Sequence, residues 1–185
     1  MRIISGQFRG RKLQSFKGKD VRPTADRIRE SMFNIIADRV VNASILDLFA
    51  GTGALGIEAL SRGAQMAVFV DGSAKSLSIL RKNIHLCHLI HCTRTVQWDI
   101  SKNLHCLKSY ATTFDLIFLD PPYNKGLVAL SMRHLIHSQC LADDTLLIAE
   151  HEVHLQPVVD TSHYIWIDTR RYGRTALSFY SFHSV

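Results

Sequence analysis

Short apolar runs alternate with amphipathic stretches through most of this chain. The apolar runs predict strands at residues 45–49, 66–71, 95–98, 115–119 and 145–149. Between them, apolar side chains recur at helical spacing, which predicts helices at residues 54–62, 74–87, 100–108 and 127–138. Strands that alternate with helices are typical of a parallel sheet that is covered on both faces.

The two ends of the chain depart from this alternation. Residues 2–5 and 9–14 alternate around two glycines, which predicts a small N-terminal β-hairpin. A helix over residues 24–39 should follow. Its apolar side chains would face inward and its charged ones outward, namely Ile28, Phe33, Ile35 and Ile36 against Arg27, Arg29 and Glu30. Residues 164–168 and 175–182 predict a C-terminal antiparallel hairpin, so the expected fold class is α/β with a mostly parallel, seven-stranded sheet.

Length and composition favour a single domain. The chain has 185 residues, of which 46% are hydrophobic, and no run approaches the roughly 18 apolar residues of a membrane helix. The N-terminus also lacks the features of a signal peptide, so we expect a cytoplasmic protein without membrane contact. Four cysteines form no C-x-x-C pair, which favours reduced thiols. Histidines and cysteines crowd residues 85–92, but no second ligand pair accompanies them, so no metal is expected.

The positive charge of the chain is concentrated at its N-terminus. Residues 1–30 hold nine Lys or Arg and three acids, whereas the remaining residues hold thirteen of each. Such a basic segment is typical of phosphate-backbone binding, although a solvated basic face has the same composition. We therefore predict a nucleic-acid-binding arm over residues 1–22, followed by an α/β domain over residues 23–185. The candidate residues for phosphate contacts, which become RNA contacts under the resemblance described below, are Arg2, Arg9, Arg11, Lys12, Arg22 and Arg27.

A glycine-rich turn follows the first predicted strand. Gly51, Gly53 and Gly56 form a G-x-G-x-x-G pattern, and Asp71 follows Gly51 by twenty residues, a spacing that suits a carboxylate on ribose hydroxyls. The pattern permits a dinucleotide or S-adenosylmethionine, and a purely structural turn would also use it. Asp47 favours S-adenosylmethionine, because its carboxylate would repel a pyrophosphate and attract an ammonium or sulfonium group.

Asp99 follows the third predicted strand and has two possible roles. Its carboxylate could accept a hydrogen bond from the amino group of an adenine ring, or it could cap the helix predicted over residues 100–108. The pattern does not decide between these roles.

The fourth predicted strand ends in Asp120-Pro121-Pro122-Tyr123, at the sheet edge where α/β folds bind ligands. Two prolines remove two N–H donors, so nearby carbonyl groups remain free to accept hydrogen bonds. If Asp120 and the Pro121 carbonyl each accept one N–H of an exocyclic amine, the nitrogen lone pair is directed toward a methyl donor. If the amine belongs to a guanine or adenine base, Tyr123 would stack on the ring of that base.

These motifs resemble those of amino-group methyltransferases with a class I, Rossmann-like fold, and more narrowly those of the RsmD family. The likeness includes residues 2–13 and 22–34, Glu150 and the Tyr172-Gly173 pair. It implies an S-adenosylmethionine-dependent enzyme that methylates guanine N2 in 16S ribosomal RNA, with guanine 966 as the family target. The implied partner is 16S rRNA or an assembly intermediate of the small ribosomal subunit, and the implied product of the cofactor is S-adenosylhomocysteine.

The resemblance also assigns residues. The catalytic set is Asp120, Pro121, Pro122 and Tyr123, and the cofactor set is Thr24, Asp47, Phe49, Ala50, Gly51, Gly53, Asp71 and Asp99. One departure concerns the ribose contact: relatives often place a second acid after Asp71, where this chain has Gly72-Ser73.

Three other functions remain open at this stage. A DNA adenine-N6 methyltransferase shares the Asp-Pro-Pro-Tyr chemistry, but usually adds a recognition region. A nicotinamide-dependent oxidoreductase would require a second domain and would not place an acid at Asp47. A non-catalytic RNA-binding module would leave the glycine turn and Asp120 without a role. We expect a monomer.

Overall fold

The computed structural model describes residues 1–16, 23–108, 110, 113–122, 126–155, 157 and 159–184, with the backbone alone at Pro23 and Thr24. It contains a seven-stranded sheet in the order β3-β2-β1-β4-β5-β7-β6. The strands are β1 (Ser44–Leu48), β2 (Met66–Asp71), β3 (Thr93–Gln97), β4 (Phe114–Leu119), β5 (Leu141–Glu152), β6 (Tyr164–Tyr172) and β7 (Thr175–Phe182).

The first five strands are parallel, and β6 and β7 form an antiparallel hairpin that extends the sheet beyond β5. This arrangement confirms the predicted fold class. β1 and β4 lie in the middle of the sheet, and all five residues of β1 are buried. Strands buried on both faces need mainly apolar residues, which explains why β1 and β4 do not show a regular alternation of apolar and polar positions.

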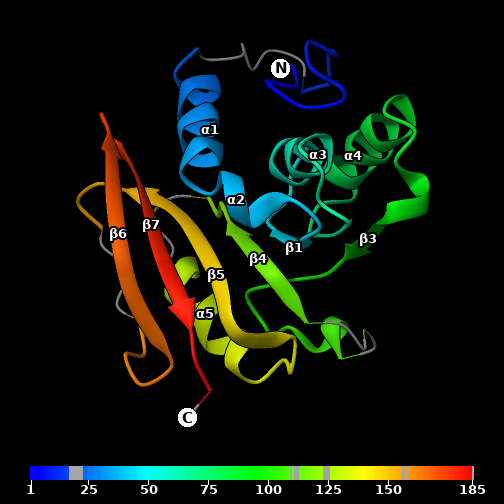
Figure 1. The fold of residues 1–185 in the computed structure, drawn as a ribbon. Coiled ribbons are helices and arrows are strands. Elements are labelled where there is room, and N and C mark those ends of the chain that lie inside the picture. Colours follow the sequence, from blue (N-terminus) through cyan, green and yellow to red (C-terminus); the bar gives the residue numbers. More distant parts are fainter. Residues whose placement is uncertain are drawn as a thin grey trace.

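Helices cover both faces of the sheet (Figure 1). One face carries α1 (Pro23–Ile35), α2 (Ala37–Val40), α3 (Ala54–Ser61) and α4 (Ala74–Leu86). The other face carries α5 (Leu127–Ile136) and the segment with the short 3-10 helix η2 (His105–Leu107), while the 3-10 helix η1 (Ile90–Cys92) precedes β3. Each face has its own apolar core.

The prediction of a helix over residues 100–108 is wrong, because this segment forms only the short 3-10 helix η2. Short polar side chains compete for the backbone in this segment. Asp99 accepts hydrogen bonds from the Ser101 N–H and hydroxyl, and Asn103 accepts one from the His105 N–H. Such local bonds favour turns over an α-helix.

The predicted faces of α1 are also partly wrong. Arg29 is buried, whereas Ile35 is 45% exposed. The Arg29 guanidinium can be buried because it lies 3.0 Å from Asp26, forms an ion pair with Glu58 and donates to the Arg2 carbonyl. This charged cluster joins α1 to α3 and to the N-terminal arm.

The N-terminal arm folds back on itself with a single bridge between Arg2 and Lys12, so within residues 1–16 the hairpin has no extended strands. It is packed against the protein. Ile3 and Leu13 belong to the core, and Glu58 of α3 accepts hydrogen bonds from the Ile4 and Ser5 N–H groups. Gly6, at φ +79°, lies so close to α3 that a Cβ would stand 1.8 Å from the Ser61 carbonyl oxygen.

Candidate active site

Acidic residues end neighbouring strands at the carboxyl edge of the sheet. Asp71 ends β2, Asp120 follows β4 directly, and Glu150 lies near the end of β5. Asp47 lies one residue before the end of β1, and Asp99 follows β3 by two residues. This edge is where open α/β sheets bind ligands, and its carboxylates favour a positively charged one.

The glycine turn connects β1 to α3 through tight packing. Gly53 has a φ of +84°, and a Cβ there would meet Leu80 at 2.2 Å. A Cβ on Gly56 would meet the Phe69 ring at 2.3 Å. The Gly56 N–H donates a hydrogen bond to the buried Asp47 carboxylate at 3.0 Å. The turn therefore needs glycine at both positions, and it ties Asp47 to the start of α3.

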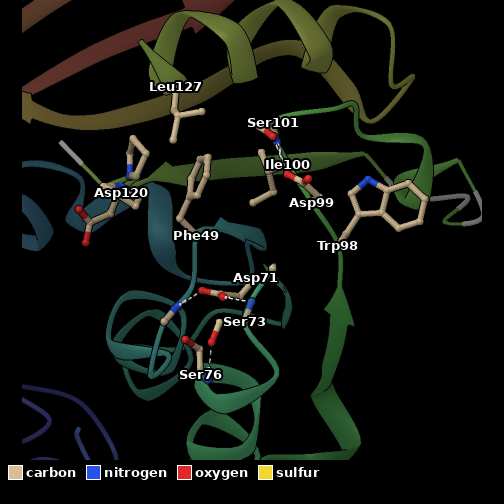
Figure 2. Close-up of a pocket in the computed structure, with 14 residues that line it drawn as sticks. Phe49, Asp71, Ser73, Ser76, Trp98, Asp99, Ile100, Ser101, Asp120 and Leu127 are labelled. Atoms are coloured by element: carbon tan, nitrogen blue, oxygen red, sulfur yellow. Dashed lines mark hydrogen bonds between the residues drawn. The ribbon is translucent and has the colours of Figure 1, made fainter. Parts of the chain in front are cut away.

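Asp71 connects the loop that follows β1 to the loop that follows β2. Its Oδ2 accepts a hydrogen bond from the Gly51 N–H at 2.8 Å, and its Oδ1 accepts one from the Ser73 N–H at 2.7 Å (Figure 2). Each carboxylate oxygen can accept further bonds, so Asp71 can still face a ligand hydroxyl. The single acid at this loop is thus fixed by backbone donors on both sides.

A cavity of about 720 Å³ lies along this edge. Figure 2 shows Asp120 at one end and Asp99 with Trp98 at the other, with the side chains of Phe49, Ile100 and Leu127 between them. The cavity gathers seven of the predicted site residues, namely Phe49, Gly51, Asp71, Asp99, Asp120, Pro121 and Pro122. Asp47 and Ala50 are buried behind it and do not line it.

Six further apolar or hydroxyl side chains of this cavity were not predicted as site residues from the sequence. They are Ser73, Ser76, Trp98, Ile100, Ser101 and Leu127. Trp98 and Ile100 flank Asp99 in the chain, so their position next to a strand end could have indicated that they line the cavity. Leu127 comes from α5 on the other face of the sheet, and no local pattern links it to the site.

Asp99 is exposed, and it caps a turn rather than a helix. The Ser101 hydroxyl, which bonds to the carboxylate at 2.6 Å, lowers the pKa of Asp99, and the Ser101 N–H and Lys102 add to this effect. Asp99 is therefore ionised at neutral pH and can accept a hydrogen bond from a ligand amino group.

Asp120 lies between two cavities. It lines the first cavity and also a second one of about 470 Å³, which α1, β5 and the β6–β7 turn surround. The residue is exposed at this edge of the sheet, where both cavities open. Desolvation of its carboxylate raises the pKa of Asp120 well above its usual range, and repulsion from Glu150 and Asp47 raises it further.

Burial also raises the pKa of Asp47, to about 7. The Gly56 N–H lowers this pKa in part, and the nearby Asp71 charge raises it. A neutral carboxyl at this position costs less than a buried charge, and a cationic ligand in the cavity would favour the ionised form.

Asp47 should make the ligand-free protein less stable as pH rises. Its folded pKa of about 7 exceeds the unfolded value of 3.8, so the folded state binds more protons between these pH values. The free energy of unfolding of the natural protein, relative to Asp47→Asn, should fall by on the order of 3 kcal/mol from pH 4 to pH 7. Urea unfolding at several pH values measures this difference, and a flat difference would contradict the shifted pKa.

Basic side chains of the arm and α1 meet at a third cavity of about 380 Å³. Arg2, Arg9 and Arg27 line it together with Asp26 and Glu30. Arg11 and Lys12 are exposed on the same arm, where Arg11 stacks on Phe8 and donates to the Leu86 carbonyl. The structure thus brings three of the predicted RNA-binding arginines together.

Three predicted site residues lie outside this description. Tyr123 and Arg22 are not among the described residues, and the Thr24 side chain is not described. Within the described ranges, no three His, Cys, Asp or Glu side chains are arranged to hold a metal ion. In the same part of the chain, no helix is long and apolar enough to cross a membrane.

The strand order, the glycine turn and the acidic sheet edge define the class I methyltransferase fold. A solved structure described as a putative methyltransferase, yhhF of Escherichia coli, matches with a TM-score of 0.86 and 35% identity over 99% of this chain and 98% of that one. The family described as conserved hypothetical protein 95 matches residues 1–181, and the chain belongs to this family.

Two relatives support the membership. The chain is 34% identical to the putative rRNA methyltransferase YlbH of Bacillus subtilis, over 97% of this chain and 98% of the relative. It is 39% identical to ribosomal RNA small subunit methyltransferase D of Escherichia coli K12, over 83% of this chain and 75% of the relative. The resemblance to the RsmD family is therefore confirmed.

Proposed function

We propose that the protein transfers a methyl group from S-adenosylmethionine to the exocyclic N2 of a guanine in small-subunit ribosomal RNA. The observation that carries this proposal is the position of Asp120, the one residue among the described linings that both the edge cavity and the second cavity share. An acceptor amine at Asp120 can be approached by the cofactor from one cavity and by the base from the other. The names of the two relatives support rRNA as the substrate.

The residues of the edge cavity suit S-adenosylmethionine. Asp71 can accept from ribose hydroxyls, and Asp99 can accept from the adenine amino group, with Ile100 and Phe49 as apolar neighbours of the ring. The acidic end near Asp120 and Asp47 suits the ammonium and sulfonium groups and disfavours a pyrophosphate. When bound, S-adenosylmethionine supplies an electrophilic methyl group.

Asp120 and the Pro121 carbonyl would orient the acceptor amine. Each accepts one N–H of the guanine N2, which pulls the nitrogen toward tetrahedral geometry. The nitrogen lone pair forms the new N–C bond, the C–S bond breaks, and its electron pair stays on the sulfur of S-adenosylhomocysteine. Asp120 stabilises the positive charge that develops on N2 and accepts the proton that N2 then loses.

The experiment that tests this function uses methyl-labelled S-adenosylmethionine with four substrates: small ribosomal subunits, assembly intermediates, naked 16S rRNA and duplex DNA. Digestion to nucleosides identifies the modified base. We expect N2-methylguanosine from rRNA, as naked RNA or within a particle. Label only in DNA adenine, or no transfer to any substrate, would contradict the proposal.

The basic cavity between the arm and α1 should contribute RNA affinity. Replacing Arg9 and Arg27 by Glu should weaken RNA binding at least tenfold at low salt and reduce its salt dependence, because phosphate contacts are lost. Cofactor affinity, measured by calorimetry, should change little. Arg133→Glu is the control, since Arg133 is exposed on α5 at the opposite face of the sheet. Equal loss in the double variant and the control would show a nonspecific charge effect.

A further inference from the structure

The second cavity contains a pair of carboxylates from neighbouring strands. Leu119 of β4 pairs with Ala149 of β5, so Asp120 and Glu150 occupy the next matching positions of the two parallel strands. Both side chains line this cavity, and their charges interact. The two acids therefore face the same space, from the sheet side.

The wall that faces the two carboxylates is apolar and suits a planar base. The rim of the cavity carries a cation that suits the phosphate of the same nucleotide. Ile28 and Met32 of α1 supply apolar surface. Tyr172, at the β6–β7 turn, is held across the cavity by a hydrogen bond between its hydroxyl and that of Ser31. Arg174 is exposed at the same turn, where a cation can meet the backbone of an extruded nucleotide.

Two adjacent carboxylates can accept hydrogen bonds from the edge of guanine that carries N1 and N2. Guanine presents the N1–H and the N2 amino group side by side, and all of these are donors. Adenine presents an amino group beside N1, which is an acceptor in the neutral base. A carboxylate opposite N1 therefore attracts guanine and repels adenine.

We propose that the second cavity is a guanine-selective base pocket in which Glu150 accepts the N1–H while Asp120 accepts an N2–H. This inference rests on the proposed function and adds the residue that selects the base. Glu150 is here a specificity-determining residue, since it contacts the ring nitrogen next to the reacting amine. Register between β4 and β5 sets the spacing of the two acceptors.

The test replaces the guanine that the labelling experiment identifies with 2-aminopurine, in the RNA or reconstituted particle that is modified. 2-Aminopurine keeps the amino group but has an acceptor at N1. The natural protein should methylate guanine with a kcat/KM at least about tenfold higher than 2-aminopurine. In Glu150→Gln, whose amide can donate to N1, this ratio should fall by on the order of tenfold.

The control is Glu152→Gln, which changes an acid on the same strand that does not line the cavity. Its ratio should equal that of the natural protein. Comparing ratios removes any general loss of folding or of cofactor binding, and the ratio of the natural protein tests the inference without a variant. An unchanged ratio in Glu150→Gln, or no preference in the natural protein, would overturn the inference while guanine methylation still stood. Failure of the proposed function appears separately, as no transfer to guanine.

Discussion

Asp120→Asn should slow methyl transfer by on the order of 10²–10³-fold and leave S-adenosylmethionine affinity within a few fold. The amide keeps the shape of the side chain but loses the negative charge that stabilises the developing charge on N2. It also cannot accept the proton that N2 releases. Single-turnover kinetics with saturating cofactor and RNA isolate the transfer step, and calorimetry gives the cofactor affinity.

The pH dependence provides a second measurement on the same variant. Because the pKa of Asp120 is raised, its ionised fraction increases as pH rises through a range above that of ordinary carboxyls. The transfer rate of the natural protein should therefore rise with pH across that range. In Asp120→Asn this rise should disappear, because no carboxyl remains there to ionise.

A matched control is Asp115→Asn on the same strand. Asp115 is exposed and accepts a hydrogen bond from the Ser44 N–H at the other end of β4, away from both cavities. This variant should keep its transfer rate and its pH profile. Full activity in Asp120→Asn would refute the proposed mechanism, and equal loss in both variants would point to a general effect on the sheet.

Four of the parallel strands, β1, β2, β4 and β5, were predictable because each contains a mainly apolar run. The residues that end the strands follow directly. This is why Asp71, Asp99, Asp120 and Pro121 could be assigned to one sheet edge before the structure was known. Only contacts between segments far apart in the chain revealed that Asp120 separates two cavities. Leu127 of α5 and Tyr172 of the last hairpin reach the site by such long-range packing.

Two predictions from the sequence were wrong, namely the helix over residues 100–108 and the exposure of Arg29. The apolar spacing of residues 100–108 suits a helix, but the polar side chains of Asp99 and Asn103 bind the backbone and form turns. Arg29 was expected on the surface, because arginine side chains in helices are mostly solvated. Its burial depends on Glu58, which is also buried and which no helical pattern links to the arm.

Glu58→Ala should destabilise the protein by about 3–5 kcal/mol, because it removes the acceptor of a buried network. The Glu58 carboxylate accepts the Ile4 N–H at 2.8 Å, the Ser5 N–H at 3.0 Å and the Arg62 Nε–H at 2.9 Å. Without it, two backbone donors lose their acceptor, and the buried Arg29 keeps only Asp26 as a counter-charge. Urea unfolding measures the loss.

The same change should separate the arm from the methyltransferase sheet. Glu58 and Ser61 form hydrogen bonds that join the arm to α3, and loss of those to Glu58 should make the arm sensitive to trypsin at Arg9 and Arg11. RNA affinity should fall more than cofactor affinity, because the cavity at Asp71 and Asp99 does not involve Glu58. Glu30→Ala, an exposed change on α1, should shift stability by no more than about 0.5 kcal/mol. An arm that stays resistant to trypsin in Glu58→Ala would mean that its other contacts hold it in place without the carboxylate. These contacts include the apolar packing of Ile3 and Leu13 and the hydrogen bonds between Gln14 and Asn83.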